Sequence, residues 1–131
     1  MAEYKVRPAF QVHRHRWIIT LTLDQSFADE LCNAVACCTD EDIKAFTRAL
    51  KSRNSAMYAQ IVGDEQAPSE FDLRLFKQTW SCSCNELFAW ALLDALVDNE
   101  EANLDKNQKV PDYLWSFREN LENRLNSKIS Q

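Results

Sequence analysis

Five cysteines are the residues whose chemistry stands out first in this 131-residue chain. They are Cys32, the adjacent pair Cys37 and Cys38, and the pair Cys82 and Cys84. Structural zinc sites combine two cysteine or histidine pairs at short spacing, because each short loop must aim two ligands at one ion. The cysteine spacings here do not supply two such pairs, so the sequence predicts neither a metal nor another cofactor. Free cysteine behaves as a small buried hydrophobic residue, and we favour that role for these thiols.

The positions of Cys82 and Cys84 depend on the structure of residues 79–86, with the sequence TWSCSCNE. On a continuous helix, steps of about 100° per residue set Cys82 and Cys84 about 160° apart, with Cys84 in the core and Cys82 on a flank. One metal could not bind both. An alternative is that a helix restarts at Ser83, which stands at capping-box spacing from Glu86. Cys84 would then enter a first helical turn, where the pKa of a thiol is lowered. We expect the continuous helix, and no thiol that reacts unusually fast.

A row of carboxylates gives the one catalytic hypothesis. Asp94, Asp98 and Glu101 are spaced i, i+4 and i+7, which places them along one side of a helix. Helical hydrolases bind Mg²⁺ with rows of this kind, but they need a second, facing row. The best candidates, Glu119 and Glu122, point away from the apolar stripe of their own helix. A magnesium-dependent all-α hydrolase is therefore an alternative, and a solvated acidic helix end is the favoured interpretation.

The N-terminal segment is basic, whereas the rest of the chain is acidic. Residues 1–16 hold four basic groups against one acid, a net +3, and the remaining residues hold 11 basic and 19 acidic groups, a net −8. Phosphate neutralisation dominates nucleic-acid affinity, so an acidic body disfavours non-specific binding to duplexes. The segment could still contact a phosphate or an acidic partner, and a nucleic-acid-contacting regulator is a second alternative. The residues proposed for this contact are Lys5, Arg7, His13, Arg14, His15 and Arg16.

The same N-terminal region shows the period-2 alternation of half-buried strands. Residues 4–12 alternate apolar and polar side chains, with Pro8 restricting this strand to an edge. Residues 17–23 are rich in β-branched and aromatic side chains and form a second expected strand. The alternative is one helix over residues 17–38. Gly63 is the only glycine in the chain, which argues against further hairpins, since their turns favour glycine.

Helical periodicity dominates after residue 24. Ser26 and Thr39 are expected helix N-caps, and the acids at residues 40–42 favour a helix start because they suit the helix dipole. The second helix is expected to run through Met57 and Ile61 to Gly63, with a break near Asn54 as the alternative. The longest periodic run, about residues 69–98, predicts a central helix whose later half, residues 87–97, should be buried on all sides because Asp94 is its only polar residue. A last helix is expected from Pro111 to residue 125.

These patterns predict a mainly α fold: one domain over residues 1–131, with four to five helices packed around the central helix at about residues 69–98. Residues 1–24 form a short basic β element and residues 25–129 the helical body. The start of the chain lacks the apolar core of a signal peptide, and no apolar run is long enough to cross a bilayer. We therefore expect a cytoplasmic protein with free thiols and without membrane contact.

The function expected from these features is non-catalytic. No nucleophile–base arrangement and no phosphate-binding glycine loop occurs in the sequence. We expect a small acidic regulatory module that acts through protein–protein contacts, of the inhibitor, adaptor or assembly-chaperone type. Four tryptophans and seven phenylalanines support this expectation, because any that remain exposed would mark an interface, including one with a second copy in a homodimer.

Overall fold

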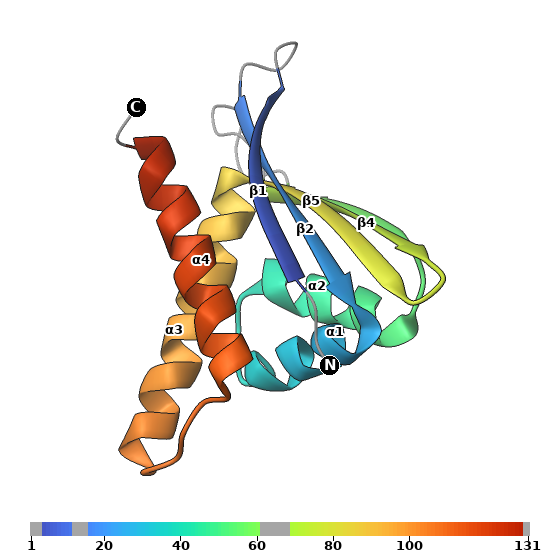
Figure 1. Ribbon diagram of the computed structural model, residues 1–131. Helices are drawn as coiled ribbons and strands as arrows, with labels where there is room; N and C mark the ends of the chain where they lie inside the picture. The colour runs from blue at the N-terminus through green and yellow to red at the C-terminus, as the bar shows by residue number, and fades with distance from the viewer. Residues whose placement is uncertain (1–3, 12–15, 61–68, 130–131) are drawn as a thin grey trace.

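A computed structural model describes residues 4–11, 16–60 and 69–129 (Figure 1). Strands and helices of these residues alternate in blocks along the chain, in the order β1 (Tyr4–Gln11), β2 (Arg16–Asp24), α1 (Gln25–Ala34), α2 (Glu41–Ser52), β3 (Ala56–Gln60), β4 (Ser69–Phe76), β5 (Thr79–Asn85), α3 (Glu86–Asp105) and α4 (Asp112–Ile129).

The five strands form one sheet in the order β1-β2-β5-β4-β3, and every neighbouring pair is antiparallel. The pairing of β2 with β5 joins the N-terminal hairpin to the later strands. In the middle of the sheet, Cys84 lies between Ile19 and Phe71, and Cys82 lies between Leu21 and Leu73. The strands β1 and β3 are the two edges of the sheet.

The architecture is therefore mixed α/β, and the prediction of a mainly α helical bundle is wrong. The expected central helix at about residues 69–98 is replaced over residues 69–85 by the hairpin of β4 and β5, which are the most central part of the sheet together with β2. Apolar residues at positions 73, 76, 80 and 84 satisfy a helical period. The strand period is satisfied as well, because Phe71, Leu73 and Leu75 alternate with polar residues.

The turn of this hairpin, Lys77 and Gln78, contains neither glycine nor asparagine. Lys77 has a φ of 59° in the two-residue turn between β4 and β5. Glycine or asparagine usually occupies a left-handed position of this kind, since a β-carbon makes it unfavourable. The scarcity of glycine therefore did not exclude a five-stranded sheet.

The helix α3 begins at Glu86 because Asn85 caps it. The Asn85 side-chain oxygen accepts from the backbone N–H of Phe88 at 3.1 Å and from that of Glu70 on β4 at 3.2 Å. Asn85 is only 4% exposed, so the cap also ties the start of the helix to the sheet. The alternative helix start at Ser83 is wrong by two residues, since Cys84 belongs to β5.

Three other predicted helix boundaries need correction. The N-caps are Asp24 and Asp40, in place of Ser26 and Thr39. The second helix, α2, ends at Ser52, where Arg53 takes the left-handed conformation, so the alternative break near Asn54 is confirmed. Its expected continuation through Met57 is wrong, because Met57 lies on β3 and is 80% exposed; Ile61 and Gly63 lie outside the described residues. The two N-terminal strands and the helix near Pro111 are confirmed, and the alternative helix over residues 17–38 is wrong.

One face of the sheet is covered by helices and carries the core. Figure 1 shows α1 and α2 beneath the sheet and α3 and α4 as a long pair beside them, and α4 packs against α3 and β1. Aromatic rings join these layers: Phe46 lies 5.7 Å from Phe71, Phe71 lies 5.0 Å from Phe88, and Phe27 lies 5.0 Å from Phe117, measured between ring centroids. Residues of β2 and β5 on the other parity, such as Thr20 and Ser81, are not buried.

The described helices include none with the length and apolar character needed to span a bilayer.

Candidate functional site

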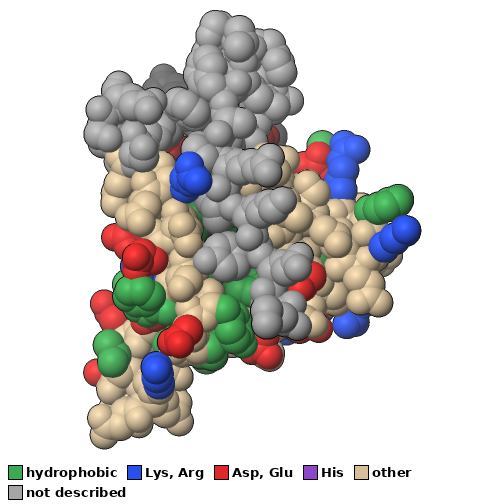
Figure 2. All heavy atoms as spheres, viewed as in Figure 1, with side chains coloured by type: hydrophobic (Ala, Val, Ile, Leu, Met, Phe, Trp, Pro, Cys, Tyr) green, Lys and Arg blue, Asp and Glu red, His purple; other side chains and the backbone are tan. Residues whose placement is uncertain are grey.

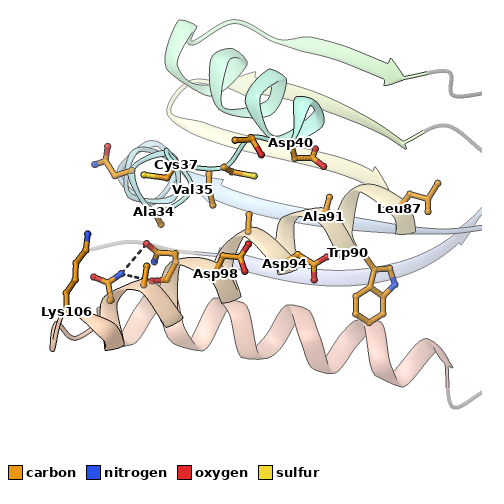
Figure 3. A pocket seen from close by; sticks show the side chains of 17 residues that line it. Ala34, Val35, Cys37, Asp40, Leu87, Trp90, Ala91, Asp94, Asp98 and Lys106 are labelled. Carbon is orange, nitrogen blue, oxygen red and sulfur yellow. Dashed lines mark hydrogen bonds between the residues drawn. The ribbon is translucent and has the colours of Figure 1, made fainter.

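The candidate site is a groove of about 860 Å³ between the end of α1 with the α1–α2 connection and one side of α3. Figure 3 shows it from close by, with α3 running along one wall and the segment around Cys37 and Asp40 on the other. The two walls are far apart in the sequence. The groove exists because α1, α2 and α3 all pack beneath the same sheet.

The α3 wall is a single stripe of this helix. Leu87, Ala91, Asp94, Asp98 and Ala102 follow one another at i, i+4, i+7, i+11 and i+15, and all of them line the groove. The prediction that residues 87–97 are buried on all sides is therefore wrong. The side of α3 that carries Phe88, Leu92 and Leu96 packs into the core, whereas Asp94 and Asp98 are exposed and Leu87 is 50% exposed.

The opposite wall is formed by residues 33–40 at the end of α1 and in the connection to α2. Cys37 is exposed there and Cys38 is partly buried. Asp40 has a structural role as well, because its carboxylate accepts from the backbone N–H groups of Asp42 at 2.8 Å and Ile43 at 3.2 Å. This cap fixes the position of the Asp40 carboxylate at the rim of the groove.

The groove is acidic. Its ionised side chains are Asp40, Asp94 and Asp98 against Lys106 at one end, a formal net charge of −2. Within the described residues, neither Asp94 nor Asp98 forms an ion pair or a side-chain hydrogen bond. Some acids elsewhere on the helices have basic neighbours, such as Asp29 with Arg53 at 3.7 Å. The charge of the groove is thus not neutralised within the described part of the chain.

Trp90 gives the groove an aromatic side chain. Its indole Nε1 donates to Glu86 Oε1 at 3.4 Å, one turn earlier on α3, which limits the rotation of the ring. Trp90 is partly buried and lies at the same end of the groove as Leu87 and Ala91 (Figure 3). One end of the groove is therefore mainly apolar, and its middle is acidic.

Two of the three predicted row carboxylates reach the groove. Asp94 and Asp98 line it, whereas Glu101 is exposed on α3 outside it. The expected second row does not face them: Glu122 is hydrogen-bonded to Arg118 on α4, and the carboxylate on the other wall is Asp40. Among the residues that the structure describes, no three His, Cys, Asp or Glu side chains gather closely enough to hold a metal ion.

Half of the residues predicted for the basic contact lie outside the described part of the chain. His13, Arg14 and His15 are outside the described residues. Lys5 and Arg7 lie on β1, paired in register with Thr22 and Thr20 of β2, and Arg16 begins β2 opposite Gln11. These register positions place Lys5 and Arg7 on the same parity as the strand residues that do not face the helices. Contact of this segment with phosphate, nucleic acid or an acidic partner remains a prediction.

The cysteines separate into a buried group and a groove group. Cys82 and Cys84 lie on the same inward face of β5, so the predicted 160° separation on a helix is wrong, although the burial of Cys84 is confirmed. A hydrogen bond with Cys84 and burial raise the pKa of the Cys82 thiol well above its ordinary value. Burial likewise raises the pKa of Cys32 to about 11. Only Cys37 is exposed.

An ion-pair network holds α3 in position. Arg118 of α4 forms a bidentate pair with Glu100 of α3, with distances of 2.6 Å from Nε and 3.0 Å from Nη2, and binds Glu122 at 2.6 Å. These hydrogen bonds, chiefly those with Glu100, raise the pKa of Arg118. The guanidinium also lies 5.1 Å from the centre of the Trp115 ring. The network lies on the side of α3 that faces α4.

Exposed hydrophobic side chains also occur outside the groove. Leu104 and Trp115 border a smaller hollow of about 630 Å³ at the turn between α3 and α4. Phe76 is 74% exposed at the β4–β5 turn, with Lys77 Nζ 5.6 Å from its ring centre. Figure 2 shows acidic and hydrophobic side chains next to one another over α3 and α4, and hydrophobic and basic ones at the β4–β5 turn. None of these exposed side chains lines the groove.

The sequence predicts one wall of the groove but not the other. It indicates Asp40 only as an acid at a helix start, and Cys37 only as a small apolar residue. No spacing pattern links residues 33–40 with residues 87–106, because tertiary packing alone brings them together. The one available signal was Asp94, a single charge in an apolar run, which indicates that this side of the helix is not in the core.

Comparisons with models of protein families, with curated proteins and with solved structures gave no match for this chain.

Proposed function

We propose that this protein is a small acidic, non-catalytic regulatory or adaptor module that binds a segment of a partner protein in the groove between α3 and the α1–α2 connection. One observation carries the proposal: a half-exposed Leu87 and the partly buried Trp90 lie beside two carboxylates that have no ion-pair partner in the described chain.

Protein interfaces combine apolar anchors with a polar rim, and tryptophan is enriched among the residues that dominate binding energy. The groove has this arrangement. Leu87 and Trp90 form the apolar end, and Asp40, Asp94 and Asp98 supply charge around it. An exposed leucine in water costs free energy that a partner side chain would recover on binding.

The remaining features support a regulatory module of the cytoplasm. All five cysteines are free, which suits a reducing compartment. The net charge of −5 keeps such a small protein apart from other acidic proteins and favours association with a basic surface. Self-association is included in the proposal, since a second copy brings its own basic N-terminal segment.

The test is site-directed cross-linking. The full chain carries a photo-cross-linker on Cys37 and is incubated in extract of the native host, and the cross-linked protein is identified by mass spectrometry. We expect one specific protein, and its capture should fall at least tenfold with Leu87→Arg. Met57→Arg is the matched control, because Met57 is more exposed than Leu87 and lies on β3 outside the groove.

Capture that Leu87→Arg and Met57→Arg affect equally would contradict a groove function. Capture that is lost with Trp115→Arg and retained with Leu87→Arg would place binding at the α3–α4 turn, and would also contradict it. Cross-links between two copies of this chain, confirmed by the mass of the complex in solution, would identify the partner as self.

A further inference from the structure

We propose that the segment bound in the groove is a cationic amphipathic α-helix of about four turns that lies along α3. This inference rests on the proposed function and specifies the chemistry of its partner. The shape, the side chains and the charge of the groove each favour this occupant.

The shape of the groove matches a helix. The α3 stripe from Leu87 to Ala102 spans about 23 Å at a rise of 1.5 Å per residue. Three alanines of this wall, Ala91, Ala95 and Ala102, are too small to keep a partner at a distance. Helices pack at interaxial distances of about 8–10 Å, and the distance depends on the size of the contact side chains. A partner helix can therefore lie close to the α3 backbone.

The charge of the groove specifies basic side chains on that helix. Asp94 and Asp98 are one helical turn apart, both exposed, and neither has a basic partner in the described residues. Asp40 adds a third carboxylate from the opposite wall. Lysine or arginine at i and i+4 on a parallel or antiparallel helix would face Asp94 and Asp98 together. The complementary charge gives such a helix specificity and a faster association rate.

The apolar end of the groove indicates where the partner helix should carry apolar side chains. On the N-terminal side of Asp94, Trp90 lies one turn away and Leu87 two turns away. Bulky apolar residues about four and seven positions from the basic pair would cover them. A polyamine could neutralise the carboxylates, but it has no apolar face with which to cover a half-exposed leucine. The groove therefore favours an amphipathic helix over a small cation.

The experiment uses synthetic peptides and the full chain. An 18-residue peptide that carries lysine at i and i+4 and leucine on the adjoining face is compared with a scrambled peptide of the same composition and with a glutamate-for-lysine version. Binding is measured by fluorescence anisotropy of the labelled peptide and by protection of Cys37 from alkylation. Only the amphipathic cationic peptide should bind, gain helical circular dichroism and slow the alkylation of Cys37.

Variants separate the groove from general acidity. Asp94→Asn with Asp98→Asn should weaken binding of the cationic peptide at least tenfold at low salt, and the difference should shrink at high salt. The matched control is Glu101→Gln with Asp105→Asn, which removes two acids from the same helix outside the groove. It should change binding less than twofold.

Three results would overturn the inference. The scrambled peptide could bind as tightly as the amphipathic one, the control variant could weaken binding as much as the groove variant, or spermine alone could protect Cys37 while the peptide does not. None of these three results would contradict the proposed function. A natural partner that is cross-linked at Cys37 and lost with Leu87→Arg would still support the groove as a binding site, and the bound segment would then not be a cationic helix.

Discussion

One side of α3 packs into the core, and another side lines the groove. The inner side carries Phe88, Leu92 and Leu96 into the core, where each is nearly inaccessible to solvent. The groove side carries Leu87, exposed carboxylates and small residues, and the cysteines on the opposite wall are the more accessible ones. The inner side can be explained by stability alone. The groove side is expected to contribute little to stability, and that is the side on which binding is proposed.

Thiol reactivity should show the largest difference between the core and the groove. Cys37 should react with a thiol reagent in native buffer at the rate of an ordinary exposed thiol. Cys32, Cys82 and Cys84 should react at least about a thousandfold more slowly, because they require opening of the fold at a cost of several kcal/mol. Mass spectrometry of the labelled sites against time measures the ratio.

In concentrated guanidinium all five thiols should react at similar rates, which is the control for intrinsic reactivity. A core cysteine that reacts as fast as Cys37 in native buffer would show that the core of the sheet is not closed.

Truncation of two leucines on α3 compares the two sides with the same chemical change. Leu92→Ala should lower the free energy of unfolding by about 2–5 kcal/mol, because Leu92 is fully buried and the change leaves a cavity. Leu87→Ala should lower it by less than about 0.5 kcal/mol, since half of this side chain is in water. Urea unfolding followed by circular dichroism measures both values. Equal losses would show that Leu87 belongs to the core.

The ion pair between α3 and α4 should give the next largest effect. Arg118→Ala should destabilise the fold by about 2–3 kcal/mol, since Glu100 would lose its bidentate partner while remaining largely buried. Glu122→Gln should cost less than about 1 kcal/mol, because Glu122 is more exposed and its loss leaves the pair with Glu100 in place. Arg118→Lys should fall between the two, as lysine cannot form the bidentate pair. A loss for Glu122→Gln as large as that for Arg118→Ala would contradict the central role of Glu100.

Alkaline pH should lower the free energy of unfolding through Cys32, a buried thiol on α1. Its thiol donates towards the Thr47 carbonyl on α2 at 3.8 Å, and burial raises its pKa from the ordinary value of 9.0 to about 11. The unfolded chain therefore loses this proton first, and stability falls as the pH rises from 9 to 11, by an amount on the order of 2–3 kcal/mol.

The measurement is the free energy of unfolding against pH for the wild type, Cys32→Ala and Cys37→Ala. The slope between pH 9 and 11 should decrease by up to one proton in Cys32→Ala and remain unchanged in Cys37→Ala. Equal slopes for the wild type and Cys32→Ala would show that Cys32 is not protected in the folded state.

The sequence predicts the separate elements of this molecule better than their arrangement. Alternation over residues 4–23 predicts β1 and β2, and acids at residues 40–42 predict the start of α2. The hairpin of β4 and β5 could not be distinguished from a helix, because its apolar residues satisfy both periods and Lys77 occupies a turn position that glycine usually takes. The pattern places Asp94 and Asp98 on one side of a helix. Their neighbours Cys37 and Asp40 follow only from the packing of α1 and α3 beneath the sheet.

The smallest effect is expected for the groove carboxylates. Asp94→Asn with Asp98→Asn should change the free energy of unfolding by less than about 0.5 kcal/mol, in the stabilising direction, because it removes unpaired like charges from exposed positions. Asparagine and aspartate have similar helix propensities, so the helix itself is not altered. The gain should disappear at 1 M salt, where the screening length is about 3 Å. A loss above 1 kcal/mol would show that these carboxylates stabilise the fold, and the difference between the two sides of α3 would then no longer support a binding role for the groove.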